Sequence, residues 1–230
     1  MRIKYLCKNY SMPNKVILLN DIVGSSRLFA KYKLKYMKLL IEIFDKVTKF
    51  AKESKGLVIK NIGDSFLISF DKMADALKFT KKMLRYTQVN KLYLSEKDND
   101  RIKFRTGIFQ GDVYKMTYKL QNKTLIDYFG NTVNTAARLE ANVSPQGGFA
   151  IGASKKNIAK VVRSITETFG DRLKIDYLVF KDDCKKIKKC KSTKNIKGVQ
   201  NIEAVTAEMI PKKKKTLKSV SRSFSLNSNR

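Results

Sequence analysis

The strongest limit on the fold of this chain comes from a helix-length stretch that lies between short runs of strand-like residues. Within residues 27–54 lysines fill one face, and apolar side chains recur at helical spacing on the other. They are Tyr36, Leu40, Ile43 or Phe44, Val47 and Ala51. Gly56 then ends the predicted helix. The apolar run at residues 16–19 precedes it and is typical of a buried strand that ends near Asp21.

The rest of the chain continues this alternation of strands and helices. Two strands at residues 58–59 and 66–70 bracket a tight turn at Gly63-Asp64. Further strands are predicted at 102–114 (bent near Gly107 or Gly111), 149–151, 172–180 and 201–206, helices at 73–87, 131–141 and 153–162, and a loop at 90–100. The order β-α-β-β-α-β followed by extra elements predicts an α+β protein, with a ferredoxin-like βαββαβ core and additional strands and helices.

The composition excludes several kinds of site. The chain has 49 Lys and Arg, 20 Asp and Glu, and a net charge of +29, yet 43% of its residues are hydrophobic, which is enough for a core. It has no histidine, so a Ser-His-Asp triad and a His-ligated zinc are excluded. Three cysteines are too few for a disulfide framework, and free thiols in a reducing compartment are expected.

The expected domain organisation is a lead at residues 1–14, a catalytic domain at 15–207 with a basic insertion at 181–195, and a disordered basic tail at 208–230. Residues 211–230 hold seven basic and no acidic residues, so the tail could attract nucleic acid or anionic lipid, or could simply be solvated. The sequence has no apolar run long enough to span a bilayer and no signal peptide, and no sensor module is recognised before residue 15. A cytoplasmic, soluble protein is expected.

Two carboxylates are the first candidates for chemistry. Asp21 ends a strand beside the turn Gly24-Ser25-Ser26, and Asp64 lies in the turn between two strands. If the strands are neighbours, both carboxylates converge at one edge of the sheet, where they could hold Mg²⁺ or Mn²⁺ and a polyphosphate. The alternative is structural: Asp64 as a turn residue and Asp21 as a helix cap.

Five segments in order extend this picture, at residues 21–26, 60–64, 105–113, 127–138 and 196–199. Together they resemble the catalytic domain of class III nucleotidyl cyclases, and the resemblance covers residues 15–207. It implies the cyclase fold and an enzyme, a phosphorus-oxygen lyase that cyclises a nucleoside triphosphate. A catalytically weak homologue that binds polyanions through its basic surface is the alternative.

The resemblance also implies a role for each matching residue. Asp21, Asp64 and the Ile22 carbonyl would hold two divalent cations per site, Mg²⁺ or Mn²⁺. The turn of Ile22, Val23, Gly24, Ser25 and Ser26 would wrap the phosphates, with Lys197 as a further phosphate ligand. Lys60 and Asp127 would read the purine, Asn134 would orient the ribose, and Arg138 would stabilise the transition state.

The base-reading pair favours ATP, with cyclic AMP and pyrophosphate as products. Lysine only donates hydrogen bonds and ionised aspartate only accepts them. Adenine offers an acceptor at N1 and a donor at N6, which Lys60 and Asp127 complement, whereas guanine reverses both. A guanylate or pyrimidine cyclase remains the alternative.

The resemblance further implies that the active site lies between two domains, one supplying the aspartates and the other Asn134 and Arg138. This chain has one such domain and carries all of these residues, so a head-to-tail homodimer with two equivalent sites is expected.

Overall fold

The computed structural model describes residues 5–89, 92–95, 98–120, 123–181, 190–192 and 202–209. The strands of this part of the chain are β1 Tyr5–Ile22, β2 Leu57–Ile62, β3 Ser65–Phe70, β4 Tyr93–Ser95, β5 Asp100–Arg101, β6 Phe104–Leu120, β7 Lys123–Phe129, β8 Gly148–Ala153, β9 Leu173–Lys181, β10 Cys190–Ser192 and β11 Glu203–Met209. The helices are α1 Ser25–Tyr32, α2 Leu34–Glu53, α3 Met73–Val89, α4 Asn131–Asn142 and α5 Ile158–Phe169.

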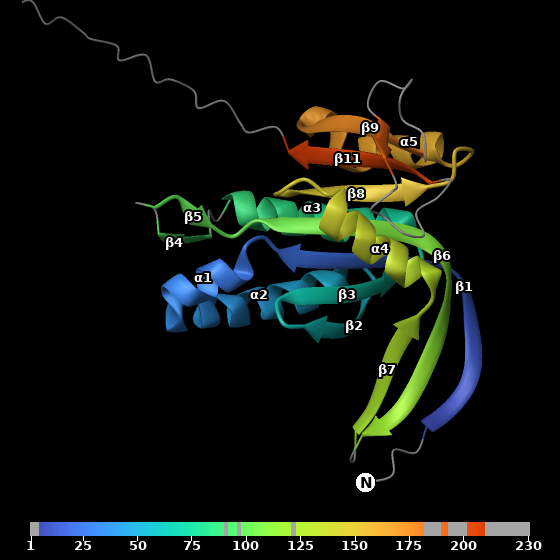
Figure 1. Ribbon diagram of the computed structural model, residues 1–230, viewed down its shortest axis with the longest axis horizontal. Helices are drawn as coiled ribbons and strands as arrows, with labels where there is room; N and C mark the ends of the chain where they lie inside the picture. Colours follow the sequence, from blue (N-terminus) through green and yellow to red (C-terminus); the bar gives the residue numbers. More distant parts are fainter. Residues whose placement is uncertain are drawn as a thin grey trace, which may run out of the picture.

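Nine of the described strands form one mixed sheet, in the order β10-β9-β11-β8-β6-β1-β3-β2 with β7 paired to β6 outside this path (Figure 1). β8 runs parallel to β6 and β10 parallel to β9, and the other pairs in this sheet are antiparallel. β4 and β5 form a separate hairpin. The predicted class, α+β with a βαββαβ core and added elements, is confirmed.

The central strands of the sheet are buried on both faces. Val16 and Leu18 of β1 point to one face, where they join the main apolar cluster with α1, α2, α3 and α5. Ile17 points to the other face and packs against Ala136 of α4. Because successive strand residues alternate between faces, a continuous apolar run marks a strand that is covered on both sides.

Several boundaries differ from the sequence prediction. The single helix predicted over residues 27–54 is two helices, because Lys33 takes a positive φ of 42° between α1 and α2. The segment predicted as a loop at 90–100 contains the β4–β5 hairpin, and the helix predicted at 153–162 is α5, which begins at Ile158.

The strands also cover more of the chain than the sequence pattern indicates. β1 begins at Tyr5, within the predicted lead, and β7 occupies a segment for which no strand was predicted. The last residues of β11 fall within the predicted tail, whereas residues 210–230 lie outside the described part of the chain, as do Lys197 and most of the predicted insertion at 181–195. None of the described helices is long and apolar enough to cross a membrane.

Candidate active site

The two aspartates come together because β1 lies beside β3. Asp21 is the penultimate residue of β1, and Asp64 occupies the turn that joins β2 to β3, with Gly63 at a φ of 62°. The antiparallel register pairs Asn20 with Phe66, so the start of β3 lies next to Asp21, and the Ser65 hydroxyl donates a hydrogen bond to Asp21 Oδ1. The structural neighbourhood that the sequence predicted for these carboxylates is therefore present.

Asp64 is in an unfavourable electrostatic environment. Burial raises the pKa of its carboxyl group, and the charge of Asp21 raises it further, while a hydrogen bond from Ser25 and the backbone N–H of Ile22 oppose the rise. Its Oδ2 atom is buried and has no hydrogen-bond partner among the described residues. A cation bound between the two carboxylates would relieve both conditions.

The donors at this point suit a hard cation. Asp21 and Asp64 would supply carboxylate oxygens, and Ile22, the residue after Asp21, would supply a backbone carbonyl; oxygen ligands of this kind hold Mg²⁺ or Mn²⁺. The described residues contain no group of three or more His, Cys, Asp or Glu side chains that could hold a metal. Any cation here would therefore complete its coordination shell with phosphate oxygens or water, as Mg²⁺ commonly does.

The turn from Ile22 to Ser26 links β1 to α1. Gly24 takes a φ of 69°, which a residue with a Cβ rarely adopts, and its carbonyl accepts the first helical hydrogen bond from Leu28 at 3.0 Å. The Ser25 hydroxyl is 2.6 Å from the Tyr36 hydroxyl. The turn thus presents the start of a helix beside Asp64, which is a geometry that suits an anion.

Lys60 and Asp127 form a second pair, on β2 and β7. The Lys60 ammonium is 2.6 Å from Asp127 Oδ2, and the backbone N–H of Tyr128 donates to Asp127 Oδ1 at 2.8 Å. The Lys60 ammonium also lies 5.9 Å from the centre of the Phe129 ring. A donor, an acceptor and an aromatic ring, which is partly exposed, therefore meet at one place.

Asn134 and Arg138 lie one turn apart on α4, so they share a face of that helix. Among the described residues, neither side chain contacts Asp21 or Asp64 through a hydrogen bond or ion pair. Glu140 lies about 200° around the helix from Arg138, and it is Glu140 that faces the aspartates of its own chain. Within one protomer, Arg138 therefore points away from Asp21 and Asp64.

Two residues near the aspartates were not singled out by the sequence. Arg105 Nη2 is 3.0 Å from Asp21 Oδ2, and Arg105 Nε is 2.9 Å from Glu140 Oε1. α4 approaches β6 very closely here, since a Cβ on Gly107 would lie 2.1 Å from the Ala136 carbonyl oxygen. The available signal was positional: Arg105 is the second residue of β6, and it pairs with Asp21 in register.

Solved structures with this fold are nucleotide cyclase domains. One is an adenylate/guanylate cyclase/hydrolase from Silicibacter pomeroyi, with 24% identity, a TM-score of 0.59, and coverage of 89% of this chain and 99% of that chain. Another is the guanylate cyclase domain of RhGC from Catenaria anguillulae in complex with GTP, with 15% identity, a TM-score of 0.59, and coverage of 88% and 100%. A third is the adenylyl cyclase CyaB from P. aeruginosa, with 16% identity, a TM-score of 0.57, and coverage of 88% and 98%.

The fold is therefore that of the catalytic domains of nucleotide cyclases. Residues 8–148 match the family described as the adenylate and guanylate cyclase catalytic domain. The chain belongs to this family and is a class III nucleotidyl cyclase catalytic domain. None of the curated proteins matches its sequence. Because the structural neighbours include both adenylyl and guanylyl cyclases, the base must be argued from the site.

Proposed function

We propose that this domain is an adenylate cyclase, which converts ATP to 3′,5′-cyclic AMP and pyrophosphate at the interface of a homodimer. The observation that carries the choice of base is the contact between Lys60 and Asp127, with the ammonium 2.6 Å from Oδ2. The pair offers one donor and one acceptor at a single place. Adenine needs that combination, for its N1 acceptor and its N6 amino group.

Guanine fits this pair poorly. Its N1–H would face the Lys60 ammonium and its O6 would face the Asp127 carboxylate, so donor would meet donor and acceptor would meet acceptor. Each buried polar group left unpaired costs about 1–3 kcal/mol. Two such groups would together cost about 2–6 kcal/mol, which lowers the use of GTP by at least about thirtyfold relative to ATP.

The reaction closes a ring within one nucleotide. The ribose 3′-oxygen loses its proton and attacks the α-phosphorus in line, while the bond between that phosphorus and the β-phosphate oxygen breaks and pyrophosphate leaves. Divalent cations held by Asp21, Asp64 and the Ile22 carbonyl would supply the acidification of the 3′-hydroxyl and neutralise the leaving phosphates. The turn binds the phosphates through the N–H groups of Gly24, Ser25 and Ser26 at the start of α1, because the N–H groups of Ile22 and Val23 already have partners.

Arg138 and Asn134 act at the site of the other protomer in this proposal. Their shared face of α4 is turned away from the aspartates of their own chain, whereas Glu140 is turned toward them. A two-fold dimer would bring the Arg138 guanidinium of one protomer to the α-phosphoryl oxygens bound by the other, where negative charge increases in the transition state. Asn134 on the same face would orient the ribose.

A nucleotide panel tests the proposal. Purified protein is incubated with each of the four common triphosphates and with Mg²⁺ or Mn²⁺, and the products are identified by mass. We expect cyclic AMP as the main product. Cyclic GMP or a cyclic pyrimidine nucleotide as the main product would refute the assignment of the base, and no cyclic product from any triphosphate would refute catalysis.

A double variant tests the base readers separately. Lys60→Glu with Asp127→Cys removes the donor for N1 and the acceptor for N6, so ATP turnover should fall by at least about tenfold and GTP turnover should gain relative to it. The matched control is Lys82→Glu, which reverses the charge at a lysine on α3. Lys82 is ion-paired with Glu53, away from Asp127. ATP turnover that survives the double change would show that these two residues do not read the base.

A further inference from the structure

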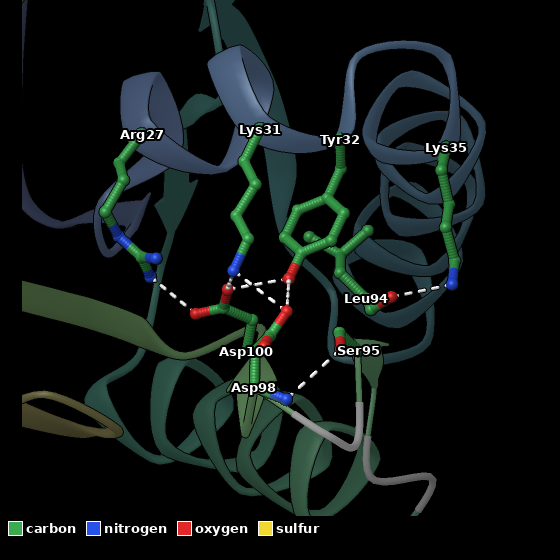
Figure 2. A network of polar contacts seen from close by, with 8 residues as sticks. All are labelled: Arg27, Lys31, Tyr32, Lys35, Leu94, Ser95, Asp98 and Asp100. Atoms are coloured by element: carbon green, nitrogen blue, oxygen red, sulfur yellow. Dashed lines mark hydrogen bonds and ion pairs between the residues drawn. The ribbon is translucent and has the colours of Figure 1, made fainter.

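Residues 92–95 and 98–103 contact the turn that follows β1 and the helices after it. The second of these stretches carries Asp100, the first residue of β5, whose side chain is only 9% exposed although it carries a charge. Figure 2 shows this carboxylate facing α1, with three side chains of that helix directed at it. A buried carboxylate needs partners, and here α1 provides them.

The three donors come from one short helix. Arg27 Nη2 donates to Asp100 Oδ1 at 2.8 Å, while Lys31 Nζ at 3.0 Å and the Tyr32 hydroxyl at 2.7 Å both donate to Asp100 Oδ2. The more exposed Asp98 accepts from Lys31 at 2.9 Å and lies 3.1 Å from the Tyr32 hydroxyl, whose single proton the two carboxylates share. The hydrogen bond from Arg27, followed by those from Tyr32 and Lys31, holds the pKa of Asp100 far below its usual range, so the carboxylate stays charged.

The same two stretches also contact the turn and the next helix. The backbone N–H of Val23 donates to the Lys103 carbonyl at 2.9 Å, and Lys35 Nζ of α2 donates to the Leu94 carbonyl at 2.6 Å. The Arg27 Nε atom lies 3.9 Å from where a Cβ on Gly24 would be. Hydrogen bonds and ion pairs with residues 92–95 and 98–103 therefore hold the turn, both ends of α1 and the start of α2.

We propose that Asp100 is a positioning residue, which fixes α1 and the turn from Ile22 to Ser26 in the conformation that binds the triphosphate. The inference rests on the proposed function of that turn. α1 has eight residues, too few for an isolated helix to be stable in water. Without the carboxylate, the cationic side chains of Arg27 and Lys31 would repel each other, and the helix would lose the fixed point that orients the N–H groups of the turn.

This position predicts a particular kinetic effect. The part of the turn next to α1, Gly24 to Ser26, binds phosphate, whereas Asp64 and Arg138 serve the reacting atoms. Loosening α1 should therefore weaken nucleotide binding more than it slows the turnover of bound substrate. Asp100→Asn should raise KM for ATP about tenfold and change kcat less than about threefold. Asp100→Glu, which keeps the charge, should recover part of the loss.

The experiment measures binding as well as turnover. The dissociation constant of α,β-methylene-ATP, whose P–C bond prevents pyrophosphate release, is determined by calorimetry with Mg²⁺ for the wild type, Asp100→Asn and two controls. Asp98→Asn removes the more exposed carboxylate of the same network, and Glu53→Gln removes an ion-paired carboxylate elsewhere. We expect about tenfold weaker binding for Asp100→Asn, and less than about threefold for either control.

Each outcome bears on the inference. Binding and KM of Asp100→Asn within twofold of the wild type, or a lower kcat at unchanged KM, would overturn it. If Asp100→Asn does not fold, Arg27→Gln with Tyr32→Phe removes two of the three donors instead, and unchanged binding in that variant overturns the inference. A wild type that neither binds the analogue nor cyclises ATP overturns the proposed function and the inference with it, whereas a working wild type with unaffected variants overturns the inference alone.

Discussion

Replacing Glu140 by Gln should change how the stability of the fold depends on pH. The Glu140 carboxyl group is buried under α4, only 5% exposed, with Arg105 Nε 2.9 Å from its Oε1. Burial raises the pKa of Glu140 to about 7, the charges of Asp21 and Asp64 add to the rise, and Arg105 opposes it. Gln has nearly the same shape and cannot ionise, so the substitution removes this titration and little else.

The raised pKa of Glu140 makes the free energy of unfolding depend on pH. In the unfolded chain the group titrates near 4.5 and in the folded protein near 7. Between these values the folded state binds more protons, so the free energy of unfolding decreases as pH rises through this window. A difference of about 2.5 pH units at about 1.36 kcal/mol per unit gives a decrease of about 3 kcal/mol in the wild type, complete above about pH 8.

The assay is urea denaturation of the wild type and Glu140→Gln at pH 5, 6, 7 and 8, in EDTA. The chain has no tryptophan, so unfolding is followed by circular dichroism. The difference in the free energy of unfolding, variant minus wild type, should increase by about 2.5 kcal/mol from pH 5 to pH 8, because titrations common to both proteins cancel. A difference that stays constant within about 0.5 kcal/mol across this range would refute the reasoning.

Three further outcomes are expected. Gly107→Ala should lower the free energy of unfolding by at least about 2 kcal/mol in urea, since its Cβ would meet the Ala136 carbonyl at 2.1 Å, and an unchanged midpoint would contradict this packing. Mixing the inactive variants Asp64→Ala and Arg138→Ala should restore part of the activity through the one complete site of the heterodimer; no recovery at any ratio would argue against shared sites. Mn²⁺ without nucleotide should raise the Tm of the wild type but not of Asp64→Ala, and an equal rise in both would place the cation elsewhere.

The core of the fold was predictable because its strands are covered on both faces. Residues 16–19 form an apolar run because α1, α2, α3 and α5 cover one face of β1 and α4 covers the other. The first half of β1 was not predictable in this way: from Tyr5 to Met12 it pairs only with β6, and β3 joins from Val16 onward. A strand with one neighbour places weak demands on its sequence, and so does β7.

Some features of the candidate site could also be predicted from the sequence, and others could not. The approach of Asp21 to Asp64 was predictable, because it needs only neighbouring strands and one tight turn. The roles of Arg105 and Asp100 were not, since each depends on a tertiary contact with a residue far away in the sequence. The break between α1 and α2 at Lys33 was missed because the apolar spacing continues through it, although the left-handed backbone at that residue turns the chain.

The ion pair between Lys60 and Asp127 has a consequence for how a base would bind. If this pair reads the base, as we propose, a base that contacts both side chains competes with the ion pair that they form at 2.6 Å. This competition weakens the binding of all bases by the same factor, and only a base that re-forms both contacts recovers the loss. Modest affinity and strict discrimination would then have a common origin, and a substitution that abolishes the self-pairing without supplying new partners should make the enzyme bind more kinds of base with less distinction among them.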